Sequence, residues 1–198
     1  IGHSRLVTNS MVDNQPILKH DICVLHNGII TNFENLFEKY KFKQNYKIDT
    51  EIIPELFRFF LNKNQDLQNT INSVLKTIKG SASCVVHLIE SGKIILFTNN
   101  GSLYKGEKNK NVYISSESYS LRQINCNKIT KVNEPVIIDV PIPKDKTLYT
   151  DHKLKRKNLV PEISNLHKNE KLLQYNMNNY KRCSKCLLPS NFPFIIFD

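Results

Sequence analysis

The apolar run Ile22-Cys23-Val24-Leu25 leads directly into His26-Asn27-Gly28-Ile29-Ile30, and this junction constrains the fold more than any other feature of the chain. The apolar run predicts a short buried strand over residues 21–26. A glycine after the strand has no Cβ, so its backbone can turn there and approach another group closely. An Asn-Gly pair is also common in hairpin turns. Here the residues after Gly28 lead into a helix rather than a return strand, which favours a close backbone approach at the strand end over a hairpin turn.

The residues around this junction predict a site for a carboxamide. Hydrolysis of a carboxamide places negative charge on the carbonyl oxygen, and hydrogen-bond donors must stabilise that charge. The Asn27 side chain and the Gly28 N–H are suitable donors. Arg5 can bind a carboxylate in bidentate fashion, and Asp49 can bind an ammonium group. These two charges match the two charged groups of free glutamine.

Several sequence blocks, taken in order, resemble the class II glutamine amidotransferases, a family that includes glucosamine-6-phosphate synthase. The blocks are IGHSRLVTNS at 1–10, Gln15-Pro16, HNGIITNFENL at 26–36, Asp49-Thr50-Glu51, Gly80-Ser81-Ala82 and ISSES at 114–118. The resemblance implies that Arg5 and Thr8 bind the glutamine carboxylate. It also implies that Asn27 and Gly28 form the oxyanion hole and that Asp49 binds the α-amino group.

The nucleophile of this family is a cysteine at the processed N-terminus, and its own α-amine acts as the base. This chain begins at Ile1, so we expect it to lack the N-terminal strand and nucleophile of the domain and to be inactive by itself. Cys23, Cys84 and Cys126 are expected to be free thiols in apolar surroundings, because an internal cysteine has no free amine to accept its proton. His26, like His3, is expected to be a satisfied core histidine.

Hydrophobic spacing predicts an α+β fold. Three helices are expected: 33–40 with Asn32 as its cap, a second starting at Asp49 or Thr50, and about 67–79 ending at Gly80. Strands are expected at 82–90, 93–98, 112–115 and 136–140. Strands joined by short connections favour antiparallel sheets covered by helices. The family resemblance implies a specific form, the four-layer αββα sandwich of N-terminal-nucleophile hydrolases.

Composition excludes several other classes of protein. No apolar run is long enough to cross a bilayer, and the odd count of 5 cysteines is unlike a secreted disulfide framework, so we expect a cytoplasmic protein. The net charge of +10 is concentrated toward the end of the chain, where residues 141–198 hold 11 Lys and Arg against 5 acidic residues. Aromatic residues do not alternate with these charges, which argues against nucleic-acid binding.

The chain divides into three predicted regions: the glutaminase domain at 1–140, a linker with a helix at 141–180, and the start of a second domain at 181–198. Cys183 and Cys186 in the third region are expected to form half of a four-thiolate zinc site, and a redox-active cysteine pair is the alternative. This tail resembles the start of the N-acetyl sugar amidotransferases, which implies an ATP-Mg-dependent domain downstream. The glutaminase domain itself is expected to need no cofactor.

We therefore predict a glutaminase domain that releases ammonia from glutamine for an acceptor, expected to be a sugar. A homo-oligomer is compatible with this prediction. The alternatives are a fragment of glucosamine-6-phosphate synthase, a non-catalytic glutamine-binding module, and an N-terminal-nucleophile hydrolase of other specificity. Arg5 and Asp49 argue against the last of these, because together they fit a free amino acid.

Overall fold

The computed structural model describes residues 13–63, 66–142 and 181. Contacts divide the chain into two compact units, Ile1–Asp151 and His152–Asp198, and all described residues except Lys181 belong to the first. The predicted linker and tail therefore lie almost wholly outside the described residues. Their limits stay predictions.

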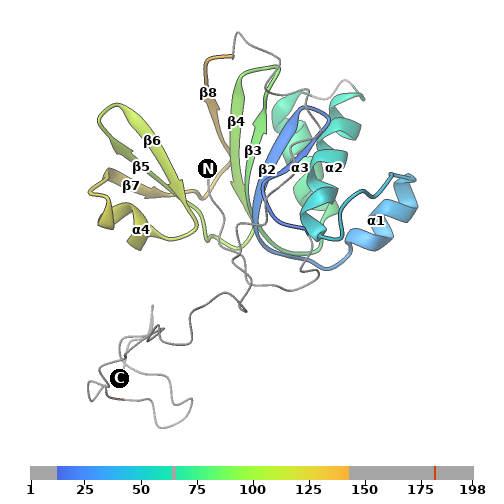
Figure 1. Cartoon of the computed structure of the whole chain (residues 1–198), viewed down its shortest axis with the longest axis horizontal. Coiled ribbons are helices and arrows are strands. Elements are labelled where there is room, and N and C mark those ends of the chain that lie inside the picture. Colours follow the sequence, from blue (N-terminus) through green and yellow to red (C-terminus); the bar gives the residue numbers. More distant parts are fainter. Residues whose placement is uncertain (1–12, 64–65, 143–180, 182–198) are drawn as a thin grey trace, which may run out of the picture. The chain divides into compact units, whose positions relative to one another are not determined.

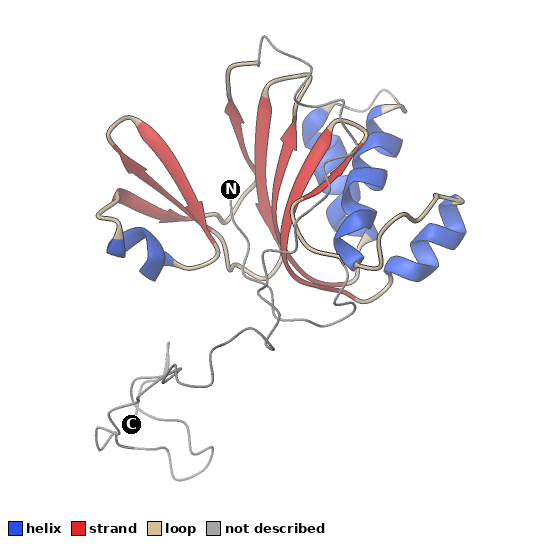
Figure 2. Cartoon of the chain, in the orientation of Figure 1, coloured by secondary structure: helices blue, strands red, loops and turns tan. Residues whose placement is uncertain are grey.

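The main sheet has five antiparallel strands in the order β1-β2-β3-β4-β8. The strands are β1 (Ile17–Lys19), β2 (Ile22–Ile30), β3 (Gly80–Leu88), β4 (Lys93–Thr98) and β8 (Val136–Asp139). Residues in β2 alternate between buried and partly buried positions as far as His26, as expected for a strand with one face on the core. Figure 2 shows the strands of this sheet in red beside the blue helices.

Helices pack on one face of the main sheet, as Figure 1 shows. They are α1 (Phe33–Tyr40), the short 3-10 helix η1 (Asp49–Glu51), α2 (Ile52–Leu61) and α3 (Leu67–Thr77). Val24 and Ile30 from β2 share one buried cluster with Leu56 and Phe57 from α2. Next to this cluster, η1 contacts β2 through Asp49, which accepts from the Ile30 N–H. None of the helices in the described ranges is long and apolar enough to cross a bilayer.

A second, three-stranded antiparallel sheet has the order β6-β5-β7. Its elements are β5 (Tyr104–Lys108), β6 (Asn111–Ser115) and β7 (Asn127–Lys131), with α4 (Ser118–Gln123) between β6 and β7. A smaller buried cluster contains Leu96 of the main sheet together with Leu103 and Val132, which flank β5 and β7. The α+β class with antiparallel sheets is as predicted.

Four local predictions were wrong. The strand predicted to end at His26 continues through Asn27 and Gly28 to Ile30, because β3 pairs with it along the whole length. Asn32 does not cap α1: its side chain donates to the Thr77 carbonyl and accepts from the Lys79 N–H. The other two corrections concern the start of α2 and the end of α3.

The start of α2 and the end of α3 differ from expectation for similar reasons. The DTE block forms the separate helix η1, and neither it nor α2 has a side-chain cap. Gly80 does not end α3, which stops at Thr77. Gly80 instead begins β3 opposite Ile30, with a φ of +104°. In both places, long-range pairing with β2 decided the local structure.

Candidate functional site

One edge of β2 faces β1. After Val24, where the pairing with β1 stops, side chains bind the backbone groups along this edge. In the β1–β2 ladder, Ile17 lies opposite Val24. Pro16, which precedes Ile17, does not extend the pairing of β1 with β2. Gln15 takes over this role: its Oε1 accepts from the His26 N–H at 2.5 Å, and its Nε2 donates to the His26 carbonyl at 2.8 Å. Both backbone groups of His26 are therefore paired.

Gly28 lies two residues further along the same edge, with a φ of +140°. Its partner in the ladder is Ala82. Ala82 directs both of its backbone groups away from Gly28, since its N–H donates to the Asn99 side chain at 2.7 Å and its carbonyl accepts from the Asn99 N–H at 2.9 Å. Ala82 therefore accepts no hydrogen bond from the Gly28 N–H. This is the donor predicted for the oxyanion.

Asp49 occupies the next position along this edge. Its side chain is 6% exposed, and Oδ2 accepts from the Ile30 N–H at 2.8 Å. The paired backbone groups of His26 and Ile30 thus lie on either side of Gly28. Asp49 does not cap a helix, which had been the structural alternative for this residue. Among the described residues, the Ile30 N–H is the one hydrogen-bond partner of this carboxylate.

His26 is a satisfied core histidine, as predicted. Its side chain is 2% exposed, and both ring nitrogens have partners at 3.3 Å. Nε2 faces the Ser81 carbonyl, which can only accept, so Nε2 carries the proton and Nδ1 accepts from the Thr50 hydroxyl. The ring links β2 to β3 and η1. It holds the strand next to the predicted oxyanion donors.

Asn27 is exposed, in contrast to its neighbour His26. Successive side chains in a strand point to opposite faces, so Asn27 lies on the face of the sheet away from α2. Of the other predicted residues, Arg5, Thr8, Cys183 and Cys186 lie outside the described residues. The structure therefore brings Asn27, Gly28 and Asp49 to one strand end.

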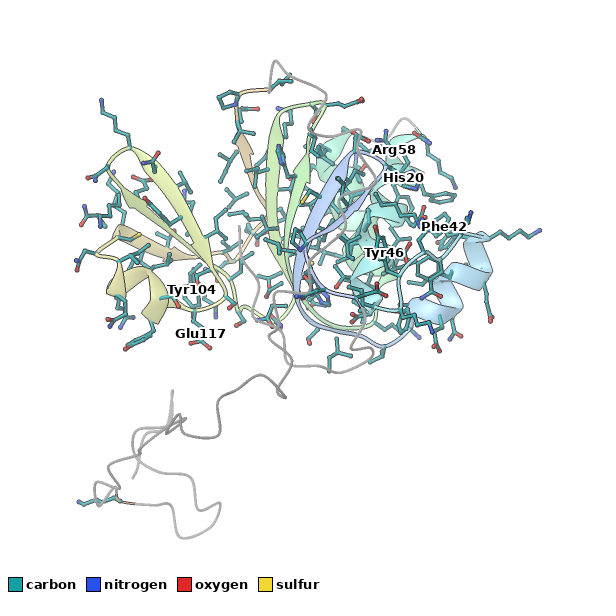
Figure 3. All side chains as sticks on the ribbon, in the orientation of Figure 1. His20, Phe42, Tyr46, Arg58, Tyr104 and Glu117 are labelled. Carbon is teal, nitrogen blue, oxygen red and sulfur yellow. The ribbon has the colours of Figure 1, made fainter. Side chains whose placement is uncertain are left out.

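A depression of about 630 Å³ lies beside this strand end and is lined by residues 29–31, 33, 34 and 44–47. The loop that forms one wall is held by Glu51, whose buried carboxylate accepts from the N–H groups of Asn45 and Tyr46, each at 2.8 Å. Figure 3 labels Tyr46 in this loop between α1 and α2. Sequence reasoning missed Glu51, although it is the third residue of the Asp49-Thr50-Glu51 block.

Glu51 belongs to a buried network of charged side chains. Lys19 is 8% exposed, and its Nζ lies 2.5 Å from carboxylate oxygens of both Glu51 and Glu55. Burial alone would lower the pKa of Lys19, but hydrogen bonds and charges from the two glutamates outweigh it and raise the pKa. Glu55 also pairs with His20 at 2.9 Å, and Arg58 donates to the His20 carbonyl (Figure 3). No sequence motif signalled this network.

A comparison with known protein families places this geometry in context. Residues 3–123 match the family model described as a glutamine amidotransferase domain. The chain belongs to the glutamine amidotransferase domain family. The matched range includes Arg5, Thr8, Asn27, Gly28 and Asp49, all proposed from the sequence alone.

Two curated relatives of this amidotransferase domain carry the same name, glutamine–fructose-6-phosphate aminotransferase (isomerizing). The protein from Buchnera aphidicola is 33% identical over 144 residues, which cover 68% of this chain and 23% of the relative. The protein from Francisella tularensis is 29% identical over 174 residues, which cover 83% of this chain and 28% of the relative. The chain thus spans about a quarter of the length of these relatives.

Solved structures confirm the fold of the amidotransferase domain. The glutamine phosphoribosylpyrophosphate amidotransferase from B. subtilis, complexed with ADP and GMP, superimposes with a TM-score of 0.56 at 19% identity. The alignment covers 69% of this chain and 32% of that protein. The N-terminal-nucleophile αββα sandwich implied by the sequence is therefore the fold of this domain.

Cys84 in the amidotransferase domain is expected to be an inert thiol. Burial raises the pKa of Cys84 well above its usual value, and the negative charge of Asp49 raises it further. The folded state thus holds the thiol proton more tightly than the unfolded chain. The stability from this group is complete below the unfolded pKa of about 8.5 and is lost as the pH rises above it.

The measurement is the unfolding free energy from urea titrations between pH 8 and 10, for the wild type and for Cys84→Ala. The wild-type value should fall more steeply, by up to about 1.4 kcal/mol per pH unit more than that of the variant. Parallel curves for the two proteins would contradict this assignment of Cys84.

Proposed function

We propose that this domain binds free glutamine and hydrolyses its side-chain carboxamide, so that the released ammonia can pass to an acceptor. The observation that carries this proposal is the position of the Gly28 N–H. It lies on the strand edge between two paired positions, His26 and Ile30, and its ladder partner directs both backbone groups elsewhere. A donor held in this way needs no reorganisation when charge develops on a substrate oxygen.

The chemistry follows from the groups at this strand end. Attack of a nucleophile on the carboxamide carbon moves an electron pair onto the carbonyl oxygen. The Gly28 N–H and the exposed Asn27 side chain donate hydrogen bonds to that oxygen. The proton lost by the nucleophile passes to the nitrogen, the C–N bond breaks and ammonia leaves; water then hydrolyses the acyl group to give glutamate and restores the nucleophile. One donor of this kind contributes about 10²- to 10³-fold to kcat.

Recognition of the substrate rests on its two charged ends. Asp49 has one carboxylate oxygen on the Ile30 N–H and the other left for the α-ammonium group. Arg5 and Thr8 are proposed for the α-carboxylate. A glutamine bound by both ends places its carboxamide at a fixed distance from Asp49, toward Asn27 and Gly28.

Asp49→Asn is expected to weaken glutamine binding without disturbing the fold. The asparagine oxygen can still accept from the Ile30 N–H, whereas the negative charge that binds the α-ammonium group is lost. We expect the affinity to fall by about 1.5–3 kcal/mol, or roughly 10- to 150-fold. Isothermal titration calorimetry with L-glutamine measures this change, and thermal unfolding checks the fold.

Asp139→Asn is the matched control, because Asp139 is 83% exposed at the end of β8 and pairs only with Lys93 among the described residues. This variant should bind glutamine like the wild type. Asp49→Ala removes the acceptor for Ile30 as well, so it should lose both affinity and thermal stability. Wild-type affinity in Asp49→Asn would overturn the assignment of this residue.

A sugar is the proposed ammonia acceptor. Support comes from the name of the two curated relatives, which gives fructose 6-phosphate as the compound they act on. The test is to incubate the whole protein that contains this domain with amide-¹⁵N-labelled glutamine and fructose 6-phosphate, and to look for ¹⁵N in an amino sugar by mass spectrometry. Incorporation only with an N-acetylated sugar and ATP-Mg would instead support the acceptor implied by the C-terminal tail.

A further inference from the structure

The side chain of Gln15 forms the same two hydrogen bonds with His26 that a backbone residue of β1 would form. Antiparallel strands pair through one N–H and one carbonyl at each hydrogen-bonded position. Counting from Ile17 opposite Val24, Gln15 is the residue that would stand opposite His26. The chain reaches that place with its side-chain amide, at 2.5 and 2.8 Å.

This bidentate contact fixes the orientation of the peptide group that joins His26 to Asn27. The His26 carbonyl belongs to that peptide group, and Gln15 Nε2 holds it. Further along the strand, Asp49 holds the N–H of Ile30. Asn27 and Gly28 lie between these two anchored points and are paired with Ser83 and Ala82 of β3 along the other edge of the strand. Movement at either anchored point changes the distance between their donors.

We infer that Gln15 is a positioning residue for the amide-hydrolysing site: it fixes His26 so that the Asn27 side chain and the Gly28 N–H can meet one oxygen. This inference rests on the proposed function. A purely structural role would change the stability of the domain alone. A positioning role also changes the surroundings of the Gly28 N–H in the folded protein and the binding of ligands that reach it.

Nuclear magnetic resonance can observe the Gly28 N–H directly. The chain has 6 glycines, and only Gly28 and Gly101 follow an asparagine. Labelling with ¹³C-carbonyl asparagine and ¹⁵N-glycine therefore selects these two amides, and Gly101 serves as the internal reference. In Gln15→Met, which has a similar length and forms neither hydrogen bond, the Gly28 signal should shift while the Gly101 signal stays in place.

Gln123→Met is the matched control, because Gln123 is exposed at the end of α4. It should leave both signals unchanged. Binding gives a second readout on the same full chains. L-glutamate carries a carboxylate where the carboxamide of glutamine would lie, whereas L-norvaline shares the α-groups and the aliphatic chain but ends in a methyl group. Gln15→Met should lower the affinity for glutamate about tenfold, the scale of one hydrogen bond, and leave the affinity for norvaline unchanged.

The outcomes separate the proposed function from the positioning role of Gln15. If the wild type binds neither amino acid, the proposed function fails, and the Gly28 signal alone decides the role of Gln15. If Gln15→Met shifts neither the Gly28 signal nor the affinity for glutamate, the positioning role is overturned. If Gln15→Met is unfolded at 25 °C, the same comparison is made with Gln15→Glu, which keeps the acceptor for the His26 N–H and loses the donor.

Discussion

Replacing Gly28 with alanine is expected to lower the free energy of unfolding by roughly 3–5 kcal/mol and to abolish the binding of glutamine. Gly28 has a φ of +140°, a conformation that residues with a side chain rarely adopt. A Cβ at this position would overlap the backbone carbonyl of Ser81 on β3. Because backbone cannot rotate away, β2 and β3 would have to separate next to the oxyanion donors.

Gly101→Ala is the matched control for this prediction. Gly101 also has a positive φ, +73°, but a Cβ there would meet only the end of the Lys131 side chain at 2.9 Å. That side chain can move, so the cost should be about 1 kcal/mol, from backbone strain alone. Urea unfolding of both variants gives the comparison. Equal losses of stability in the two would show that contact with Ser81 is not the cause.

Lys19→Met is expected to destabilise the domain by about 3–5 kcal/mol, because it leaves the buried carboxylates of Glu51 and Glu55 without their shared counter-charge. Glu51 also holds the loop beside the strand end, through the N–H groups of Asn45 and Tyr46. The substitution should therefore also weaken the hold on the loop that forms one wall of the depression. Urea unfolding measures the change in stability.

Lys128→Met provides the matched control for Lys19. Lys128 pairs with Glu107 at 3.3 Å, but the two side chains are 78% and 42% exposed, so this substitution should cost less than about 1 kcal/mol. The double variant Lys19→Met, Glu51→Gln removes one of the two unpaired charges. It should be more stable than Lys19→Met alone, and a larger loss in the double variant would contradict the electrostatic explanation.

The sequence alone was enough to predict the family, the α+β class and most helices and strands. The extent of α1 was predicted residue for residue, because its apolar residues repeat at helical spacing and because Tyr40 ends the pattern. The β3–β4 hairpin was also predicted, since two β-rich runs are joined by a short turn. These features depend on residues close together in the chain, and local patterns report them well.

The tertiary structure decided how the predicted site is held. The sequence identified Asn27, Gly28 and Asp49 by chemistry and order. It did not show that Asp49 binds the Ile30 N–H, that Gln15 extends the β1–β2 ladder, or that Lys19 lies buried between two glutamates. Each of these contacts joins residues 11 to 36 positions apart in the chain. Such pairings follow from strand register and helix packing, which no local pattern encodes.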